Sequence, residues 1–359
     1  MIDPKRIRQN PEEFQRLLNR RNLSLSVDAF LHQDEKRRQL LNEAEEKKAL
    51  RNNAGKLIGL ARKKGADDQQ IEALMADAQC LSQEIEQLDA DIAAISTQID
   101  EFLLSLPNLP HPEVPDDESQ QLRLTGEPRR FLWEPKSYQE IGTDLHLTVK
   151  LPARDAPVSC GLGARLERSL TSFFLDQLSG NGFKELITHS KAEAVSIYQN
   201  DILTADQLPL RHCSTGIGSI QLLGLSEMEH SYDDLTVLIA SIERLLSLLK
   251  LPCRILMLSA QKLDFIAAMT ICIEVWAPSL QQYVPAARFT NHEDFIARRE
   301  AIRCRVQARE KPRYLHTLSG TVDIAGCIVQ SILENHQNED GSVEVPEALV
   351  PYMGCQIIR

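Results

Sequence analysis

The feature that most constrains this chain is a regular apolar seam between residues 71 and 99. The apolar side chains alternate spacings of three and four residues, which is the a/d pattern of a coiled coil held over about four heptads. The seam consists of Ile71, Leu74, Ala78, Leu81, Ile85, Leu88, Ile92, Ile95 and Ile99. The pattern predicts one long helix that packs along a second helix.

The preceding stretch offers a partner with a weaker seam. Its members are Leu40, Leu50, Ala54, Leu57 and Ala61. The polar segment 63–67, which contains a glycine, separates the two patterns. We therefore predict that residues 29–104 form an antiparallel helical hairpin. A short helix is expected earlier, after the cap residue Asn10, because Pro11 and two glutamates follow it.

Charge is divided between the two predicted helices. Residues 34–64 hold ten basic and five acidic side chains, whereas residues 67–101 hold ten acidic and no basic ones. One interpretation is mutual attraction between two solvated helix faces, since charge runs are usually solubility features. The other is a basic strip that contacts the phosphates of a nucleic acid. The candidate RNA contacts are Arg37, Arg38, Lys47, Lys48, Arg51, Lys56, Arg62, Lys63 and Lys64.

Composition limits the remaining classes. The 359 residues are 43% hydrophobic and 25% charged, as in ordinary globular proteins. The net charge of −11 repels nucleic acid, so nucleic acid can be bound only by a local basic patch. The eight cysteines form no C-x-x-C pair. With no signal peptide, transit peptide or apolar run of membrane length recognised, we expect reduced thiols, a cytoplasmic location and no membrane contact.

Four prolines in residues 105–115 exclude a helix there and predict a boundary. The predicted organisation is a helical arm domain over 1–104, a Pro-rich linker over 105–118 and a body over 119–359. In the body we expect an amphipathic helix that ends at Gly180 and a helix over 234–250, with a capping box from Ser231 to Asp234.

Strands are expected over 254–258 and 270–276, and a further helix over 326–336. Strands and helices do not alternate regularly, so the predicted fold class is α+β with an antiparallel sheet rather than a doubly wound fold.

Several segments, in this order, resemble the seryl-tRNA synthetases over nearly the whole chain. They are the opening residues 1–12, Arg51-Asn52-Asn53 with Lys56-Leu57-Ile58-Gly59, the Pro-rich segment 105–115, Gly163-Ala164-Arg165-Leu166-Glu167-Arg168, Glu274-Val275-Trp276, Glu293-Asp294-Phe295, His316-Thr317-Leu318, residues 332–337, Val345-Pro346-Glu347 and Pro351-Tyr352-Met353-Gly354. The resemblance implies a class II synthetase body with a six- to seven-stranded antiparallel sheet flanked by helices. It implies dimerisation through the motif 1 helix at 163–179, and a hairpin that embraces the long variable arm of serine tRNA.

The same resemblance indicates that the chemistry has been lost. The position of the glutamate that holds Mg²⁺ and ATP is Pro285, and the position of the motif 3 arginine is Cys327. Beside the serine site, Ser319 replaces an asparagine, while Thr321 retains a hydroxyl. Residues 212–220 lack the arginine and glutamate of motif 2, and the T-x-E segment that holds serine has no counterpart. The motif 1 proline position is His189.

We therefore expect no catalytic residue, with Thr321 only a vestige of the serine site. ATP and Mg²⁺ are not expected to bind in the family manner, because several phosphate-binding groups are missing together. A zinc site built from Cys272, His292, His316 and Cys327 is conceivable but not expected, because their spacing matches no metal motif.

Three functions remain open from the sequence. The preferred hypothesis is a catalytically inactive paralogue that binds serine-type tRNA through the arm. The second is a role in protein interaction, either as a dimer partner or regulator of an intact seryl-tRNA synthetase or as a purely protein–protein interaction scaffold, with a homodimer as the default assembly. The third is residual serine–tRNA ligase activity, which would use ATP to activate serine.

Overall fold

The computed structural model describes residues 1–23, 25–63, 65, 67–149, 158–187, 194–305 and 310–359. The chain divides into two compact units. The first holds residues 1–19 and 23–107, and the second holds residues 20–22 and 108–359. None of the described helices combines the length and the apolar character needed to cross a bilayer.

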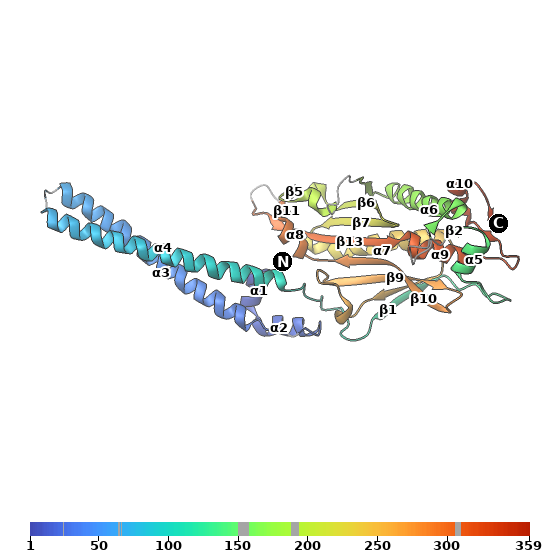
Figure 1. The fold of residues 1–359 in the computed structure, drawn as a ribbon, viewed down its shortest axis with the longest axis horizontal. Coiled ribbons are helices and arrows are strands. Elements are labelled where there is room, and N and C mark those ends of the chain that lie inside the picture. Colours follow the sequence, from blue (N-terminus) through green and yellow to red (C-terminus); the bar gives the residue numbers. More distant parts are fainter. Residues whose placement is uncertain (24, 64, 66, 150–157, 188–193, 306–309) are drawn as a thin grey trace. The chain divides into compact units, whose positions relative to one another are not determined.

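The first unit is helical (Figure 1). Its helices are α1 (Pro4–Gln9), α2 (Pro11–Asn19), α3 (Asp28–Lys63) and α4 (Asp68–Ser105). The predicted cap is confirmed, because the side-chain oxygen of Asn10 accepts a hydrogen bond from the Glu13 amide at 3.2 Å. Helices α3 and α4 form the predicted antiparallel hairpin, and Phe30 stacks on Phe102 near its base with ring centroids 6.0 Å apart.

The seam of α4 is confirmed, since each of its nine residues is buried or half-buried. The seam of α3 is confirmed only in part. Leu40, Ala54 and Ala61 are half-buried as predicted, but Leu50 and Leu57 are exposed, at 57% and 46%. The buried and half-buried side of α3 also carries Ala44, Lys47, Arg51 and Ile58. Long charged side chains such as Lys47 and Arg51 can lie half-buried there because their aliphatic stems tolerate apolar surroundings.

The second unit is built on an eight-stranded sheet with the strand order β1-β8-β9-β10-β13-β7-β6-β4. Its strands are β1 (Gln120–Thr125), β4 (Lys184–Glu185), β6 (Leu210–Gly216), β7 (Ser219–Ser226), β8 (Cys253–Met257), β9 (Met269–Ala277), β10 (Gln282–Asn291) and β13 (His316–Asp323). Neighbouring strands are antiparallel except β4 and β6. The sheet is therefore larger than the six or seven strands expected, and β4 adds one parallel pair.

Smaller strands pair outside this sheet. They are β2 (Thr148–Val149) with β3 (Val158–Ser159), β5 (Ile202–Thr204) with β11 (Arg303–Arg305) and β12 (Arg313–Tyr314), and β14 (Val343–Glu344) with β15 (Ile357–Ile358). The helices of this unit are α5 (Tyr138–Asp144), α6 (Gly161–Ser179), α7 (Ser231–Leu248), α8 (Phe295–Glu300), α9 (Val329–Asn335) and α10 (Val350–Met353). Together these elements confirm the predicted α+β class.

Helices α6 and α7 cover one face of the large sheet through the main apolar core. The stripe of α6 is confirmed, and Gly180 caps its end. The capping box predicted at Ser231 is wrong. Helix α7 begins at Ser231 itself, and the Ser231 hydroxyl lies 2.7 Å from His316 Nδ1 in the core instead of capping the helix. The opposite face carries a smaller core around Val195, Leu223 and Leu225, and it holds the candidate site.

Candidate functional site

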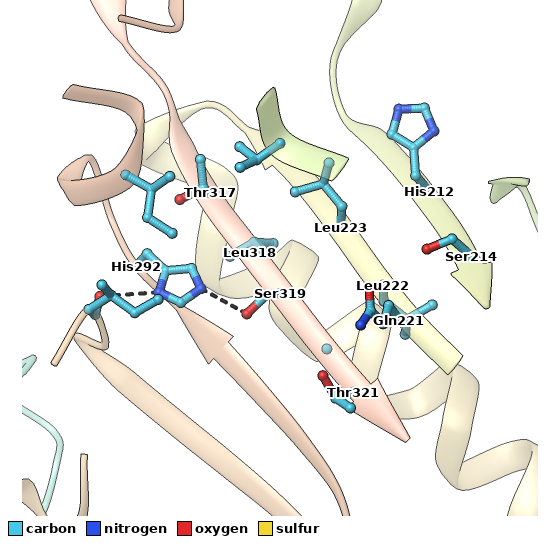
Figure 2. Close-up of a pocket in the computed structure, with 14 residues that line it drawn as sticks. His212, Ser214, Gln221, Leu222, Leu223, His292, Thr317, Leu318, Ser319 and Thr321 are labelled. Atoms are coloured by element: carbon cyan, nitrogen blue, oxygen red, sulfur yellow. Dashed lines mark hydrogen bonds between the residues drawn. The ribbon is translucent and has the colours of Figure 1, made fainter. Parts of the chain in front are cut away.

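A cavity of about 210 Å³ lies on the sheet face opposite α6 and α7, along strand β13 (Figure 2). Thr317, Ser319 and Thr321 face it together because alternate residues of a strand point to the same side. Its other lining residues are Val195, His212, Ser214, Gln221, Leu222, Leu223, Ile266, His292, Ile296, Leu318 and Gly320. Thr321, the predicted vestige of the serine site, therefore does line a pocket.

The strand register arranges these side chains in two rows. Ser319 pairs with Leu223, which pairs in turn with His212 on β6. Thr321 pairs with Gln221, and Gln221 pairs with Ser214. The first row consists of a hydroxyl, an aliphatic side chain and an imidazole, and the second of a hydroxyl, an amide and a hydroxyl. Neither row contains a charged side chain.

His292 contacts the pocket as a neutral imidazole. Burial lowers its pKa to about 4. Its Nδ1 lies 3.1 Å from the carbonyl oxygen of Ile266, so this nitrogen must carry the proton and donate. Its Nε2 then accepts from the Ser319 hydroxyl at 2.8 Å (Figure 2). The proton of Ser319 is therefore already used within the protein.

His212 has the same arrangement on the other side of the cavity. Its Nδ1 lies 3.3 Å from the carbonyl oxygen of Lys184, and its Nε2 lies 2.6 Å from the Tyr198 hydroxyl. Burial lowers the pKa of His212, which favours the neutral ring. Both histidines thus donate to backbone carbonyls and accept from hydroxyl groups.

A second cavity of about 190 Å³ contains the two positions where the family resemblance places nucleotide-binding groups. Pro285 and Cys327 both line it, together with the carboxylates of Asp323 and Glu334. The Glu334 carboxylate accepts from the amides of Tyr138 and Ser279, at 3.0 and 3.1 Å. Burial raises the pKa of the Cys327 thiol to about 11, so the thiol stays protonated. The described lining of this cavity carries acids and no cation.

The tight turn between β6 and β7 closes onto the beginning of the helix that follows β13. The carbonyl oxygen of Gly218 accepts from the amides of Ile324 and Ala325, at 3.0 and 2.9 Å. Asp323 accepts from the Gly326 amide at 2.8 Å. Helix N-terminal amides often bind phosphate, but these three are satisfied by the chain itself.

These residues do not fit a nucleoside triphosphate with its magnesium ion. A triphosphate needs cations and free amide donors, whereas the cavity offers two carboxylates, a protonated thiol and amides that are already bonded. Arg211 does not supply the charge, because its guanidinium lies 2.7 Å from the carboxylate of Asp234.

The four residues considered for zinc are engaged elsewhere or remain protonated. His292 contacts Ser319, and His316 contacts Ser231. Burial raises the pKa of Cys272 to about 11, as it does for Cys327. Within the described part of the chain, no group of three or more His, Cys, Asp or Glu residues gathers in a way that could hold a metal ion.

On the arm, four of the nine candidate RNA contacts are held by acidic side chains. Arg37 and Arg38 pair with Asp34, a buried carboxylate that also receives Arg8 at 2.8 Å. Lys47 and Lys48 reach across to α4. Lys47 lies 2.7 Å from Glu84, and Lys48 lies 2.8 Å from Asp89. The two lysine contacts match the interpretation of mutual attraction between the helices, whereas the pairs of Arg37 and Arg38 with Asp34 lie within α3.

The other candidates lie closer to the tip. Lys56, Arg62 and Lys63 are exposed, and Arg51 is half-buried. Among the described residues none of these four forms an ion pair. Lys64 lies outside the described residues, as does His189 at the motif 1 position.

Sequence reasoning missed His212, Ser214 and Thr317 as pocket residues, and it missed Tyr198 as the hydrogen-bond partner of His212. The alternation of hydroxyl residues at 317, 319 and 321 was the one signal that could have indicated a polar strand face. Nothing in the sequence indicates that His212 lies in the same row as Ser319, because that depends on the register of three strands.

Comparison with known proteins decides the family. Residues 1–110 match the seryl-tRNA synthetase N-terminal domain. The serine–tRNA ligase of Carboxydothermus hydrogenoformans is 36% identical, and the alignment covers 100% of this chain and 99% of that relative. The chain belongs to the seryl-tRNA synthetase family. The alignment runs over 426 positions, whereas this chain has 359 residues. At least 67 residues of the Carboxydothermus ligase therefore have no counterpart in this chain.

Solved structures support the same family fold. The seryl-tRNA synthetase from Pyrococcus horikoshii, which was crystallised with ATP, superposes with a TM-score of 0.91 at 25% identity and covers 100% of this chain and 99% of its own. The cytoplasmic serine–tRNA ligase from Naegleria fowleri, in complex with AMP, has a TM-score of 0.85 at 17% identity over 98% and 96% of the two chains. The class II fold of the family is therefore retained, although the chain is shorter than its bacterial relative.

Proposed function

We propose that this chain is a catalytically inactive member of the seryl-tRNA synthetase family that binds serine-type tRNA. The observation that carries the proposal is the closure of the β6–β7 turn onto the helix after β13. The Gly218 carbonyl takes two amides at the start of that helix, beside Cys327 at the arginine position. Phosphate-binding donors are thereby lost both as side chains and as backbone amides.

The loss is large in energetic terms. Removing one donor that stabilises transition-state charge costs on the order of 10²–10³ in rate. Here the positions of the metal-binding glutamate and the motif 3 arginine are Pro285 and Cys327, and the hairpin 210–226 has no motif 2 pair. Even without strict additivity, these losses make activation of serine with ATP negligible.

The arm supports the binding half of the proposal. Lys56, Arg62 and Lys63 present exposed positive charge that the described acidic residues of α4 do not take up. Double-stranded RNA is bound largely through its phosphates, and the long variable arm of serine tRNA offers such a duplex. The proposed organisation keeps the arm in 1–104, a linker in 105–118 and a degenerate body in 119–359, working in the cytoplasm.

A protein partner is part of the same proposal. The motif 1 helix α6 is kept, and isologous self-association is the commonest arrangement, so a homodimer is the default. A heterodimer with an intact seryl-tRNA synthetase is the alternative assembly. It would let an inactive subunit influence an active one.

A second candidate function is residual serine–tRNA ligase activity. The 36% identity with a serine–tRNA ligase over the whole chain favours it, as does the hydroxyl of Thr321 in the cavity along β13. It predicts serine-dependent exchange of pyrophosphate into ATP, which the inactive protein lacks.

Titration of the purified protein with serine tRNA, at two salt concentrations, tests the binding proposal. A tRNA without the long variable arm is the control. We expect tighter, salt-sensitive binding of the serine tRNA. Absence of binding to either RNA would reject RNA binding and leave a protein-contact role.

A further inference from the structure

The described lining of the β13 cavity contains no charged side chain. Its two histidines are neutral, because burial lowers the pKa of each. The nearest cation in the strand register is Arg288, which pairs with Thr321 but is exposed and does not line the cavity. A zwitterionic amino acid would lose its hydration here without gaining a counter-charge inside the pocket.

The cavity has an open end and a closed end. Thr321 is exposed and marks the mouth, whereas Thr317, four residues earlier on the same face of β13, is fully buried. Figure 2 shows Thr317, Ser319 and Thr321 in order along the strand. Leu223, Ile266 and Ile296 contribute apolar surface to the walls. A ligand would therefore enter past Thr321 and place its far end near Thr317.

The closed end offers one hydrogen-bond acceptor and one donor. The Ser319 hydroxyl donates its hydrogen bond to His292, so its oxygen can still accept a hydrogen bond from a ligand. The hydroxyl of Thr317 is buried and has no hydrogen-bond partner among the described atoms. A buried hydroxyl without a protein partner is unfavourable, so a polar ligand atom that bonds to the Thr317 hydroxyl gains free energy of binding.

The volume limits the size of the ligand. An engineered apolar cavity of about 150 Å³ holds benzene. At about 210 Å³, this cavity suits a ring or branched chain of roughly six to ten non-hydrogen atoms. Such a body covers the apolar walls and carries one small polar group to the closed end.

We propose that this cavity binds a small uncharged alcohol or primary amide with an apolar body. The hydroxyl or amide group donates to the Ser319 oxygen and accepts from the Thr317 hydroxyl. This site is independent of RNA binding by the arm, and it differs from a serine site because it recognises no charge.

Benzyl alcohol and toluene form a matched pair of probes, since they share a ring and differ in the hydroxyl. Their binding to the full-length protein can be measured by ligand-observed NMR titration. We expect a dissociation constant on the order of 1 mM for benzyl alcohol. Toluene should bind about fivefold more weakly, because it lacks the hydrogen bonds at the closed end.

Two variants locate the site. Thr317→Val keeps the shape of the side chain and removes its hydroxyl. It should bring benzyl alcohol close to the affinity of toluene while leaving toluene unchanged, and it should raise the melting temperature of the free protein. Thr321→Trp should block the mouth and abolish binding of both probes. Thr236→Trp, at an exposed position of α7, is the control and should bind both probes normally.

Three results would overturn the proposal. One is the absence of saturable binding of benzyl alcohol to the unmodified protein. Another is equal binding by the Thr321→Trp variant, which would place the probe elsewhere. The third is tighter binding of benzoate or serine than of benzyl alcohol, which would show that charge, for instance that of Arg288, is recognised instead.

Discussion

Removing two exposed lysines near the tip of the arm should weaken tRNA binding in a salt-dependent way. Lys56 and Lys63 are exposed and lack an ion pair within the described part of the chain. Each phosphate contact contributes about 0.9 to the slope of log affinity against log salt. The double variant Lys56→Gln/Lys63→Gln should therefore lower the magnitude of that slope by about 1.8. When the salt concentration rises from about 50 to 200 mM, the factor by which the unmodified protein loses affinity should be about 12 times the factor for the variant.

The matched control is Lys47→Gln/Lys48→Gln, which changes the net charge equally. These lysines lie 2.7 and 2.8 Å from Glu84 and Asp89, so their charge is already balanced. We expect their slope to stay within about 0.5 of the unmodified protein. Fluorescence anisotropy of labelled serine tRNA at three salt concentrations gives all the slopes. Equal slopes for the two double variants would refute the distinction between paired and free lysines.

Three further predictions concern stability. Asp34→Asn leaves Arg8, Arg37 and Arg38 without their buried carboxylate. It should lower the free energy of unfolding, measured by urea denaturation, by about 3 kcal/mol. The control Glu35→Gln removes an exposed carboxylate and should lower it by less than about 1 kcal/mol. Gly218→Ala places a methyl group 2.9 Å from the Ala325 Cβ at a φ of +65°. Its melting temperature should fall further than that of Gly182→Ala, where φ is +88° and, among the described residues, no atom beyond the chain neighbours lies within 4 Å of the new methyl group. Equal falls would show that the turn does not press on the helix. Because the pKa of His292 is about 4 in the folded chain and about 6.5 when unfolded, the unfolded state binds more protons between these values. Stability should therefore drop by about 3 kcal/mol as the pH falls from 6.5 to 4, and His292→Gln should flatten that dependence in denaturation series.

The arm shows what a hydropathy pattern can and cannot predict. The seam of α4 is apolar throughout, so its spacing predicted the contact side correctly. On α3 the contact side includes the half-buried Lys47 and Arg51, and the Lys47 ammonium pairs with Glu84 of α4. A pattern that counts lysine as polar selects Leu50 and Leu57 instead, and both are exposed.

Family resemblance could point to positions of the candidate site, but it could not predict how the side chains are arranged there. Family resemblance indicated Pro285, Cys327 and Thr321 by position, and the structure separates them into two cavities. The neutral character of the β13 cavity depends on the backbone carbonyl to which each histidine donates. This is the carbonyl of Ile266 for His292 and of Lys184 for His212. Such long-range pairings arise from the sheet register, and no local motif encodes them.

Serine-dependent exchange of pyrophosphate into ATP tests the proposed loss of catalysis most directly. An intact serine–tRNA ligase, such as the Carboxydothermus relative, serves as the positive control. We expect the purified protein to give no exchange above the blank without protein. Exchange that requires serine, and that disappears in Thr321→Ala, would contradict the proposal and establish the chain as a working ligase.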